Sequence, residues 1–521
     1  MAFVGILAAL AFFLFICYLL MSARHRARPK TWPLLGVLPN VVLNAYQIHN
    51  FVHHLLRKNG YTSHLKVPMF PELSHLLTSD PDNVHHILAQ NSSNYIRGQG
   101  FRNIFDVLGD GVIAADGESW KLQRRLLHSL FKQPEFLKME EKKVRAKVES
   151  GVCKLLDRAA RSGSEIDLQD VLHRFTFDIA CWIALGCDAS SLSFEARHSQ
   201  LLKAMDDIEE TTLRRYFKPR VFWKLQRWMQ MGVEKRGWRI NKLFEFIDQQ
   251  ISLRRREPPE TEGGEAEVIV KHSNITSRIL SEEDQTELAA KFSNKNQLDK
   301  FIKDLVFSIL TAGSDTSSSA LAWFFWLVET NPSVKSNIIQ EMRQAEHESH
   351  HVDHVWKFPN SHKLNYLHAA LCETLRLYPA APFNHRSSVK PDTLPSGHRI
   401  DGGTPVVIPM YTMGRMQEIW GEDCREFKPE RWINDGSVVH YPSNKFCSFG
   451  GGARICPGRD LAFMNMKIIA AAVVCNYDLH VVDGSRIKPA SAMVLRMKHG
   501  LKVRVTKKNI ICRTSNHSSD E

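Results

Sequence analysis

The chain contains one long apolar segment, residues 301–330, that no proline interrupts. Apolar side chains occur almost all round a helix of this sequence, which is typical of a helix buried on every side. Asn331 and Pro332 follow, and we expect the helix to end there because proline cannot continue it. Only a large domain can surround such a helix. The rest of the chain reads as mostly helical, with weak alternation at 61–77, so the sequence predicts a mainly α fold with small β-sheets.

A polar segment, residues 312–317 (AGSDTS), lies in the middle of this apolar helix. Serine and threonine can bond back to the preceding turn and glycine weakens the helix, so we expect a local opening there. A buried acid beside a hydroxyl is costly, and proton delivery is a function that would justify the cost. Asp315 and Thr316 are therefore candidate catalytic residues. A kink without chemistry is the alternative.

A glycine-rich segment, residues 449–458 (FGGGARICPG), surrounds Cys456. Three glycines lack the Cβ atoms that would keep backbone N–H groups away from the sulfur, and a helical pattern follows whose positive end would lie near it. Both features favour a thiolate. Neither the P-loop pattern nor G-x-G-x-x-G fits the segment, which excludes a phosphate cradle. A lone cysteine would otherwise be a small buried hydrophobe.

Five short segments occur in the order of the signature motifs of the cytochrome P450 family, which the chain resembles. WKLQR at 120–124 is similar to its W-x-x-x-R helix, and AGSDTS at 312–317 to its A/G-G-x-D/E-T-T/S motif. ETLR at 373–376 and PERW at 429–432 resemble the two parts of its structural Glu-Arg-Arg triad. The segment at 449–458 matches F-x-x-G-x-R-x-C-x-G, the haem-binding loop of that family.

This resemblance implies a P450 fold and a haem cofactor whose iron has Cys456 as its metal ligand. Phe449 would shield the sulfur. Asp315 and Thr316 would deliver protons on the oxygen-binding side. The haem propionates would be bound by Trp120, Arg124, Arg386 and Arg454. His385, which lies next to Arg386 in the sequence, is an alternative donor to the propionate.

The resemblance also implies a monooxygenase that uses O2. The chain carries no flavin or nicotinamide fingerprint, so electrons would come from a separate NADPH–cytochrome P450 reductase docking on a basic face. Buried ion pairs rarely repay their desolvation, so a Glu-Arg-Arg cluster argues for specific packing. In the family this triad, here Glu373, Arg376 and Arg431, holds the cysteine loop and does not react.

The N-terminal residues 2–21 are uncharged and mostly apolar, and a helix of this length spans the ~30 Å core of a bilayer. We interpret them as one transmembrane anchor; a cleaved signal peptide is the alternative. Basic residues begin the proline-rich connector at 22–45, which places the catalytic domain, 46–506, in the cytosol. We expect it at the endoplasmic reticulum membrane, with 507–521 as a disordered tail.

Charge restricts the partners only loosely. Lys and Arg number 68 against 56 Asp and Glu, a net charge of +12 that suits an anionic surface such as a membrane. The arginines at 254–256 open a polar surface connection, 254–298, without interleaved aromatic residues, so we expect no nucleic-acid partner. The histidines at 347–354 lack cysteines beside them and are interpreted as a surface loop.

For the substrate, segments such as WPLLGVLPN and FDVLGDGVIAADGESW resemble the plant P450 clan that oxidises fatty acids, and within it the long-chain alkane hydroxylases of cuticular wax. The resemblance implies an apolar substrate, a long-chain alkane or fatty acid. Oxidation of a phenolic alkaloid precursor is one alternative and a haem-thiolate rearrangement is another; the intact Asp315–Thr316 pair favours a monooxygenase. Candidate pocket residues are Phe101, Phe105, Leu108, Ala312, Ala380, Ala381, Phe383 and Val494.

Overall fold

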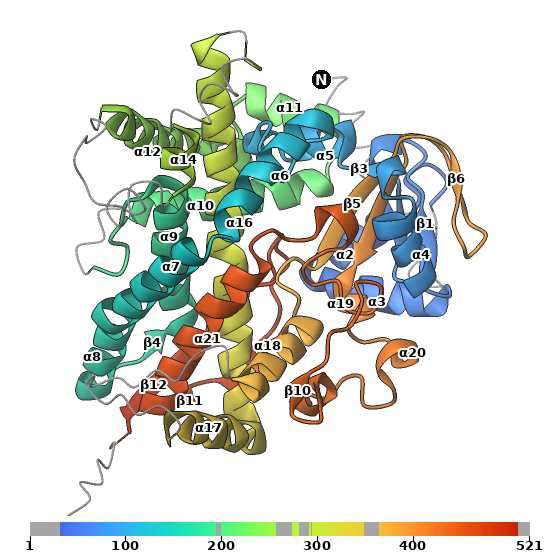
Figure 1. Ribbon diagram of the computed structural model, residues 1–521. Helices are drawn as coiled ribbons and strands as arrows, with labels where there is room; N and C mark the ends of the chain where they lie inside the picture. Colours follow the sequence, from blue (N-terminus) through green and yellow to red (C-terminus); the bar gives the residue numbers. More distant parts are fainter. Residues whose placement is uncertain are drawn as a thin grey trace, which may run out of the picture.

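A body of helices surrounds one long central helix, and a smaller unit rich in strands lies beside it (Figure 1). The central helix is α16 (Lys295–Thr330). The predicted mainly α fold with small sheets is therefore confirmed. The computed structural model describes residues 32–193, 199–256, 274–280, 291–292, 294–347 and 364–508.

The helices of the described residues range from 4 residues in α19 to 36 residues in α16. Before α16 they are α2 (Leu38–Leu43), α3 (Ile48–Lys58), α4 (Pro81–His85), α5 (Gly98–Ile104), α6 (Gly117–Phe131), α7 (Pro134–Lys147), α8 (Lys154–Ser162), α9 (Leu168–Leu185), α10 (Ser199–Tyr216), α11 (Arg220–Trp228), α12 (Gly237–Arg256) and α14 (Ile275–Ile279). After α16 they are α17 (Pro332–His347), α18 (Asn365–Leu377), α19 (Met410–Met413), α20 (Gln417–Trp420) and α21 (Arg459–Asn476).

Helix α16 ends before Asn331, as predicted, but it starts ahead of residue 301 because the Asn294 side chain caps it by accepting from the Gln297 N–H at 3.0 Å. The expected opening at 312–317 is wrong, since the helix is continuous there. Its glycine instead allows a close approach of α9: a Cβ on Gly313 would lie 3.3 Å from the Cβ of Ala180. Helix α9 packs along the middle of α16.

Within the described residues, four small sheets accompany the helices. The small sheet expected from the alternation at 61–77 is present as β1 and β2, and β2 pairs with β8 in parallel, whereas the other described strand pairs are antiparallel. The largest sheet has the order β1 (Thr62–Leu65), β2 (His75–Thr78), β8 (Pro405–Pro409), β5 (Phe383–Ser388) and β3 (Tyr95–Ile96). The others pair β11 (Tyr477–Val481) with β12 (Lys502–Lys507) and β4 (Ile166–Asp167), β9 (Ile433–Asn434) with β10 (Ser437–Val438), and β6 (Asp392–Thr393) with β7 (Arg399–Ile400).

The N-terminal predictions fall partly outside the described residues. The anchor proposed at 2–21 lies there, and within the described part of the chain no helix has the length and apolarity needed to cross a membrane. The proline-rich connector contains a helix that the sequence did not predict, α2. Pro39 occupies its first turn, where the missing N–H costs no hydrogen bond.

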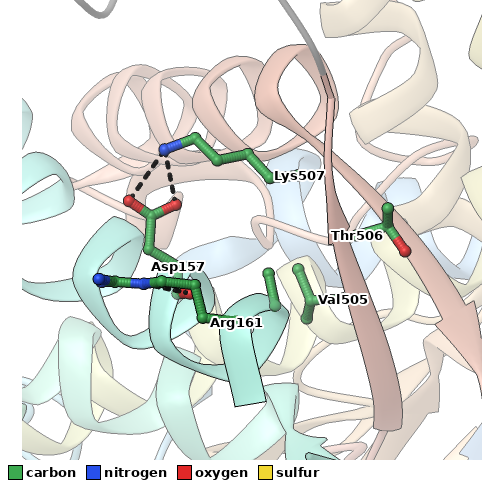
Figure 2. Close-up of a pocket in the computed structure, with 6 residues that line it drawn as sticks. Asp157, Arg161, Val505, Thr506 and Lys507 are labelled. Atoms are coloured by element: carbon green, nitrogen blue, oxygen red, sulfur yellow. Dashed lines mark hydrogen bonds and ion pairs between the residues drawn. The ribbon is translucent and has the colours of Figure 1, made fainter. Parts of the chain in front are cut away.

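At the other end of the chain, the sheet runs past residue 506, the predicted end of the catalytic domain. Strand β12 includes Lys507, and the Lys508 N–H donates to the Asn476 carbonyl at 2.9 Å. Figure 2 shows Lys507 facing Asp157 of α8, 3.0 Å away, beside a hollow of about 450 Å³ between α8 and β12. This hollow contains none of the predicted site residues.

Candidate active site

The cysteine loop is closed by its own backbone. The Cys456 N–H donates to the Phe449 carbonyl at 2.8 Å. Gly450 and Gly452 have φ values of +75° and +60°, and a Cβ on Gly452 would lie 1.7 Å from the Leu88 carbonyl oxygen. The left-handed backbone and this close packing therefore require glycine here. From the sequence we had expected a different role for these glycines, which was to let backbone N–H groups approach the sulfur.

The Cys456 side chain is accessible although protein surrounds it on nearly every side, so it faces an internal hollow. Burial raises the pKa of its thiol, and the Gly458 N–H, Arg124 and Arg459 offset that increase only in part. The expected support for a thiolate exists, but desolvation outweighs it. A metal that binds this sulfur would displace the proton.

The predicted helix pair lies beside this loop. Trp120 and Arg124 are one turn apart on α6, and the Arg124 guanidinium donates to the Ile455 carbonyl, next to the cysteine. The Arg454 guanidinium lies 4.4 Å from the centre of the Trp120 ring, a cation–π contact, and it donates to Asp116 at 2.6 Å. The structure thus brings these three predicted residues together.

A further predicted arginine, Arg386 on β5, lies close by and is buried. Its guanidinium donates to the Asn384 side-chain oxygen at 2.6 Å and to the His385 carbonyl at 2.8 Å, both neutral groups. Burial and then the charge of Arg97 hold the pKa of Arg386 well below its usual range. The His385 ring lies 2.8 Å from the Tyr216 hydroxyl, and its alternative role as a propionate donor stays a prediction.

Arg97 was not predicted from the sequence. It follows the short strand β3, and its guanidinium donates to the His385 carbonyl at 2.8 Å, while its backbone N–H donates to Asp116. Burial and Arg454 lower the pKa of Arg97. No local pattern marks this arginine, because its role arises from β5, a strand far along the chain.

The charges of the arginines around Asp116 indicate whether these residues suit a haem. Arg97, Arg386 and Arg454 converge on one nearby carboxylate, Asp116, so excess positive charge is buried. Such charge is costly unless anions accompany it, and a ligand with two carboxylates would neutralise it. The residues fit a haem: Cys456 would hold its iron, and Trp120, Arg97, Arg124, Arg386 and Arg454 would hold its propionates.

On the oxygen side, Thr316 donates its hydroxyl hydrogen to the Ala312 carbonyl at 2.7 Å. Ala312 is exposed even though α16 runs through the core, so this face of the helix also borders a hollow. Asp315 is buried on another face, with one carboxylate oxygen 2.8 Å from His173 Nε2 and 2.8 Å from an Arg496 nitrogen. The Asp315 carboxylate therefore does not point toward the Thr316 hydroxyl.

The surroundings of Asp315 keep it ionised. Burial alone would raise the pKa of its carboxyl, but Arg496 and His173 outweigh burial and lower the pKa. The carboxylate ties α16 to α9 and to the segment of Arg496. Its role in proton delivery stays a prediction, and the two partners were missed because they lie 142 and 181 residues away in sequence.

The Glu-Arg-Arg cluster is confirmed as a contact. Both oxygens of the Glu373 carboxylate accept from Arg376 at 2.7 Å, and one also accepts from Arg431 at 3.2 Å. Glu373 and Arg376 are buried. The Ser448 hydroxyl donates to the Leu375 carbonyl at 2.8 Å, which connects α18 to the segment that leads into the cysteine loop.

The predicted pocket residues divide into groups. Phe383 stacks on His49 of α3 with ring centres 5.2 Å apart and packs against a cluster between α3 and the five-stranded sheet, so its assignment to the pocket stays a prediction. Three others are buried: Phe101, Leu108 and Ala380. The members that keep exposed surface are Phe105, Ala312, Ala381 and Val494.

A cysteine that faces an internal hollow, beside guanidinium groups that could pair with the two propionates of a haem, is the arrangement of a haem-thiolate enzyme. The family model of cytochrome P450 matches residues 27–505. The chain therefore belongs to the cytochrome P450 family. It is a P450 monooxygenase that uses haem with an axial cysteine thiolate, O2, an electron donor and a hydrophobic substrate.

Curated relatives cover nearly the whole chain. The chain is 39% identical to alkane hydroxylase MAH1 of Arabidopsis thaliana, over 98% of this chain and 100% of the relative. It is 35% identical to cytochrome P450 86B1 of the same plant, over 96% and 89%. It is 34% identical to noroxomaritidine synthase 2 of Narcissus aff. pseudonarcissus MK-2014, over 97% of each.

Proposed function

We propose that this P450 hydroxylates a long-chain alkane or fatty acid with electrons from NADPH–cytochrome P450 reductase. The observation that carries the proposal is the apolar character of the side chains that keep exposed surface in the interior, which are Phe105, Ala312, Ala381 and Val494. Apolar walls suit a substrate without polar groups near the reacting carbon. The full-length similarity to a protein named an alkane hydroxylase supports the same substrate class.

Oxidation of a phenolic amine is the second candidate, because a noroxomaritidine synthase is similar over the same length. A panel of a long alkane, a fatty acid and a phenolic amine, incubated with enzyme, reductase and NADPH, distinguishes the candidates by mass analysis. We expect a product one oxygen heavier from an aliphatic chain. A product from the phenolic amine alone would reject the proposal.

Thr316→Ala is expected to uncouple NADPH consumption from hydroxylation. The reaction R–H + O2 + 2 e⁻ + 2 H⁺ → R–OH + H2O needs protons on the oxygen-binding side, and the Thr316 hydroxyl borders the hollow there. Losing one hydrogen bond of about 1.4 kcal/mol lowers product per NADPH by about tenfold. Ser317→Ala, on the next residue, is the matched control. Unchanged coupling in Thr316→Ala would contradict the role.

The proposed site of action is the cytosolic face of the endoplasmic reticulum membrane. Supporting it, apolar side chains gather in the open where α11 meets the N-terminal segment. The Met69 N–H donates to the Leu34 carbonyl at 2.9 Å, and the rings of Phe70 and Phe222 are in contact at 6.2 Å. We define the apolar surface as the exposed apolar side chains of these segments, which are Leu34, Val42, Leu43, Met69, Val221, Phe222, Leu225, Trp228 and Met229. Exposed apolar surface of this kind suits a lipid interface.

Deleting residues 1–31 is expected to release the protein from alkali-washed membranes but to leave weaker vesicle binding through the apolar surface. Adding Phe222→Ser and Trp228→Ser should lower the remaining vesicle affinity by about tenfold or more, since each ring would bury apolar area worth ~1.5 kcal/mol or more. Leu253→Ser, on the distal end of α12, is the control for a single exposed apolar residue. Alkali-resistant binding without residues 1–31 would contradict the predicted anchor.

A further inference from the structure

A cavity of about 120 Å³ opens between α5, β5 and the segment that joins α10 to α11. Its outer end carries exposed side chains such as Glu72 and Arg220, and its inner end is formed by the buried Arg386 and Phe101. The inner end therefore adjoins the arginine cluster assigned to the haem propionates. The cavity leads from the surface toward the cofactor side of the protein.

Five cationic side chains line this cavity: Arg97, Arg215, Lys218, Arg220 and Arg386. Arg97 and Arg386 belong to the propionate cluster. Arg215 is paired with Glu234 at 2.8 Å and with Asp106 at 2.7 Å. Two cations thus remain for a ligand, Lys218 and Arg220.

Lys218 and Arg220 have no carboxylate within ion-pair distance among the described residues. The Lys218 ammonium donates to the neutral Gln226 side chain at 2.9 Å. At Arg220 it is the backbone N–H that meets the carboxylate of Glu72, at 3.4 Å. Lys218 is half-buried, whereas Arg220 extends into solvent. Lys218 is therefore the cation better placed to hold an anion inside the cavity.

The two histidines that line the cavity, His75 and His385, are held toward their neutral forms. Burial lowers the pKa of His75, and burial with neighbouring basic groups holds the pKa of His385 well below its usual range. The His385 ring is also engaged with the Tyr216 hydroxyl. A negative ligand in this cavity thus meets the Lys218 ammonium group and not a charged imidazole.

We propose that the cavity is the entrance for a substrate with a carboxylate end, and that Lys218 binds this carboxylate. The proposal rests on the proposed function and narrows it from alkanes and fatty acids to fatty acids. The chain would pass along Tyr216 and the stacked rings of Phe101 and Phe105, whose centres are 4.1 Å apart. Because Lys218 would hold the carboxylate in this cavity, oxidation would occur at carbons remote from the carboxylate.

Lys218→Met is expected to raise KM for a long-chain fatty acid by about tenfold, as for loss of one charge-assisted hydrogen bond at a half-exposed site, with kcat little changed. KM for the alkane of equal length should stay the same. Calorimetric binding of the fatty acid should weaken by a similar factor, and raising the salt concentration should weaken it in the wild type only. Lys218→Arg should restore the affinity for the fatty acid. Lys224→Met, on the exposed part of α11, is the charge-matched control.

Glu72→Gln tests the sign of the charge effect. Removing a negative charge from the cavity mouth should lower KM for the fatty acid and leave KM for the alkane unchanged. Equal effects of Lys218→Met on acid and alkane, or none, would overturn the proposal while the proposed function stands. So would weaker binding of Lys218→Met to anionic vesicles with unchanged KM, which would assign the lysine to lipid headgroups. If the wild type oxidises neither chain, the proposed function fails and this inference fails with it.

Discussion

Replacing Cys456 with alanine is expected to abolish substrate oxidation and to remove the thiolate-specific absorption band of the reduced, carbon monoxide-treated protein. The thiolate is the ligand that pushes electron density toward the iron and favours O–O cleavage, and alanine leaves no atom to replace it. In this variant the arginine cluster would still be able to bind the haem propionates. We therefore expect the variant to retain some weakly bound porphyrin, measured as haem per protein, but no turnover.

Cys447→Ala is the matched control, because Cys447 lies in the same segment but its sulfur is buried 3.4 Å from the Met413 sulfur and does not face the hollow. This variant should keep both the absorption band and turnover and lose only packing, about 1 kcal/mol of stability. A Cys456→Ala protein with an unaltered spectrum would show that another group ligates the iron.

Local patterns predicted those parts of the molecule that depend on neighbours in sequence. The one-turn spacing of Trp120 and Arg124 predicts a shared helix face, and a proline predicts where α16 ends. The Glu373–Arg376 spacing predicts a contact on one helix. Each of these features is set within a few residues, and the structure shows each of them.

Features that depend on tertiary packing could not be predicted in this way. His173 and Arg496 reach Asp315 only because α9 and a distant loop fold onto α16, and no spacing encodes that. Arg97 likewise gains its role from β5. The balance at Cys456 also escaped prediction, because glycine content and helix position indicate what favours a thiolate but say nothing about how much desolvation opposes it.

Glu373→Gln is expected to lower the free energy of unfolding by about 3–5 kcal/mol and to cause haem loss during purification. The carboxylate accepts from Arg376, Arg431 and the Trp432 indole N–H, at 2.7, 3.2 and 2.8 Å. Glutamine keeps the shape but removes the charge and points an amide N–H group toward a guanidinium. Chemical denaturation and haem retention measure the two effects.

Glu430→Gln is the control from the same P-E-R-W segment, because the Glu430 carboxylate is exposed and accepts a hydrogen bond from the Tyr366 hydroxyl at 2.6 Å. An exposed contact of this kind is worth about 1 kcal/mol or less. The double variant Glu373→Gln, Arg376→Met separates charge from packing. Arg376 also donates to the Cys424 and Glu426 carbonyls, so removing it relieves the unpaired charge but leaves those oxygens without a donor. If the double variant is no more stable than Glu373→Gln, the loss comes from the hydrogen bonds that tie α18 to the segment before the cysteine loop and not from a stranded charge.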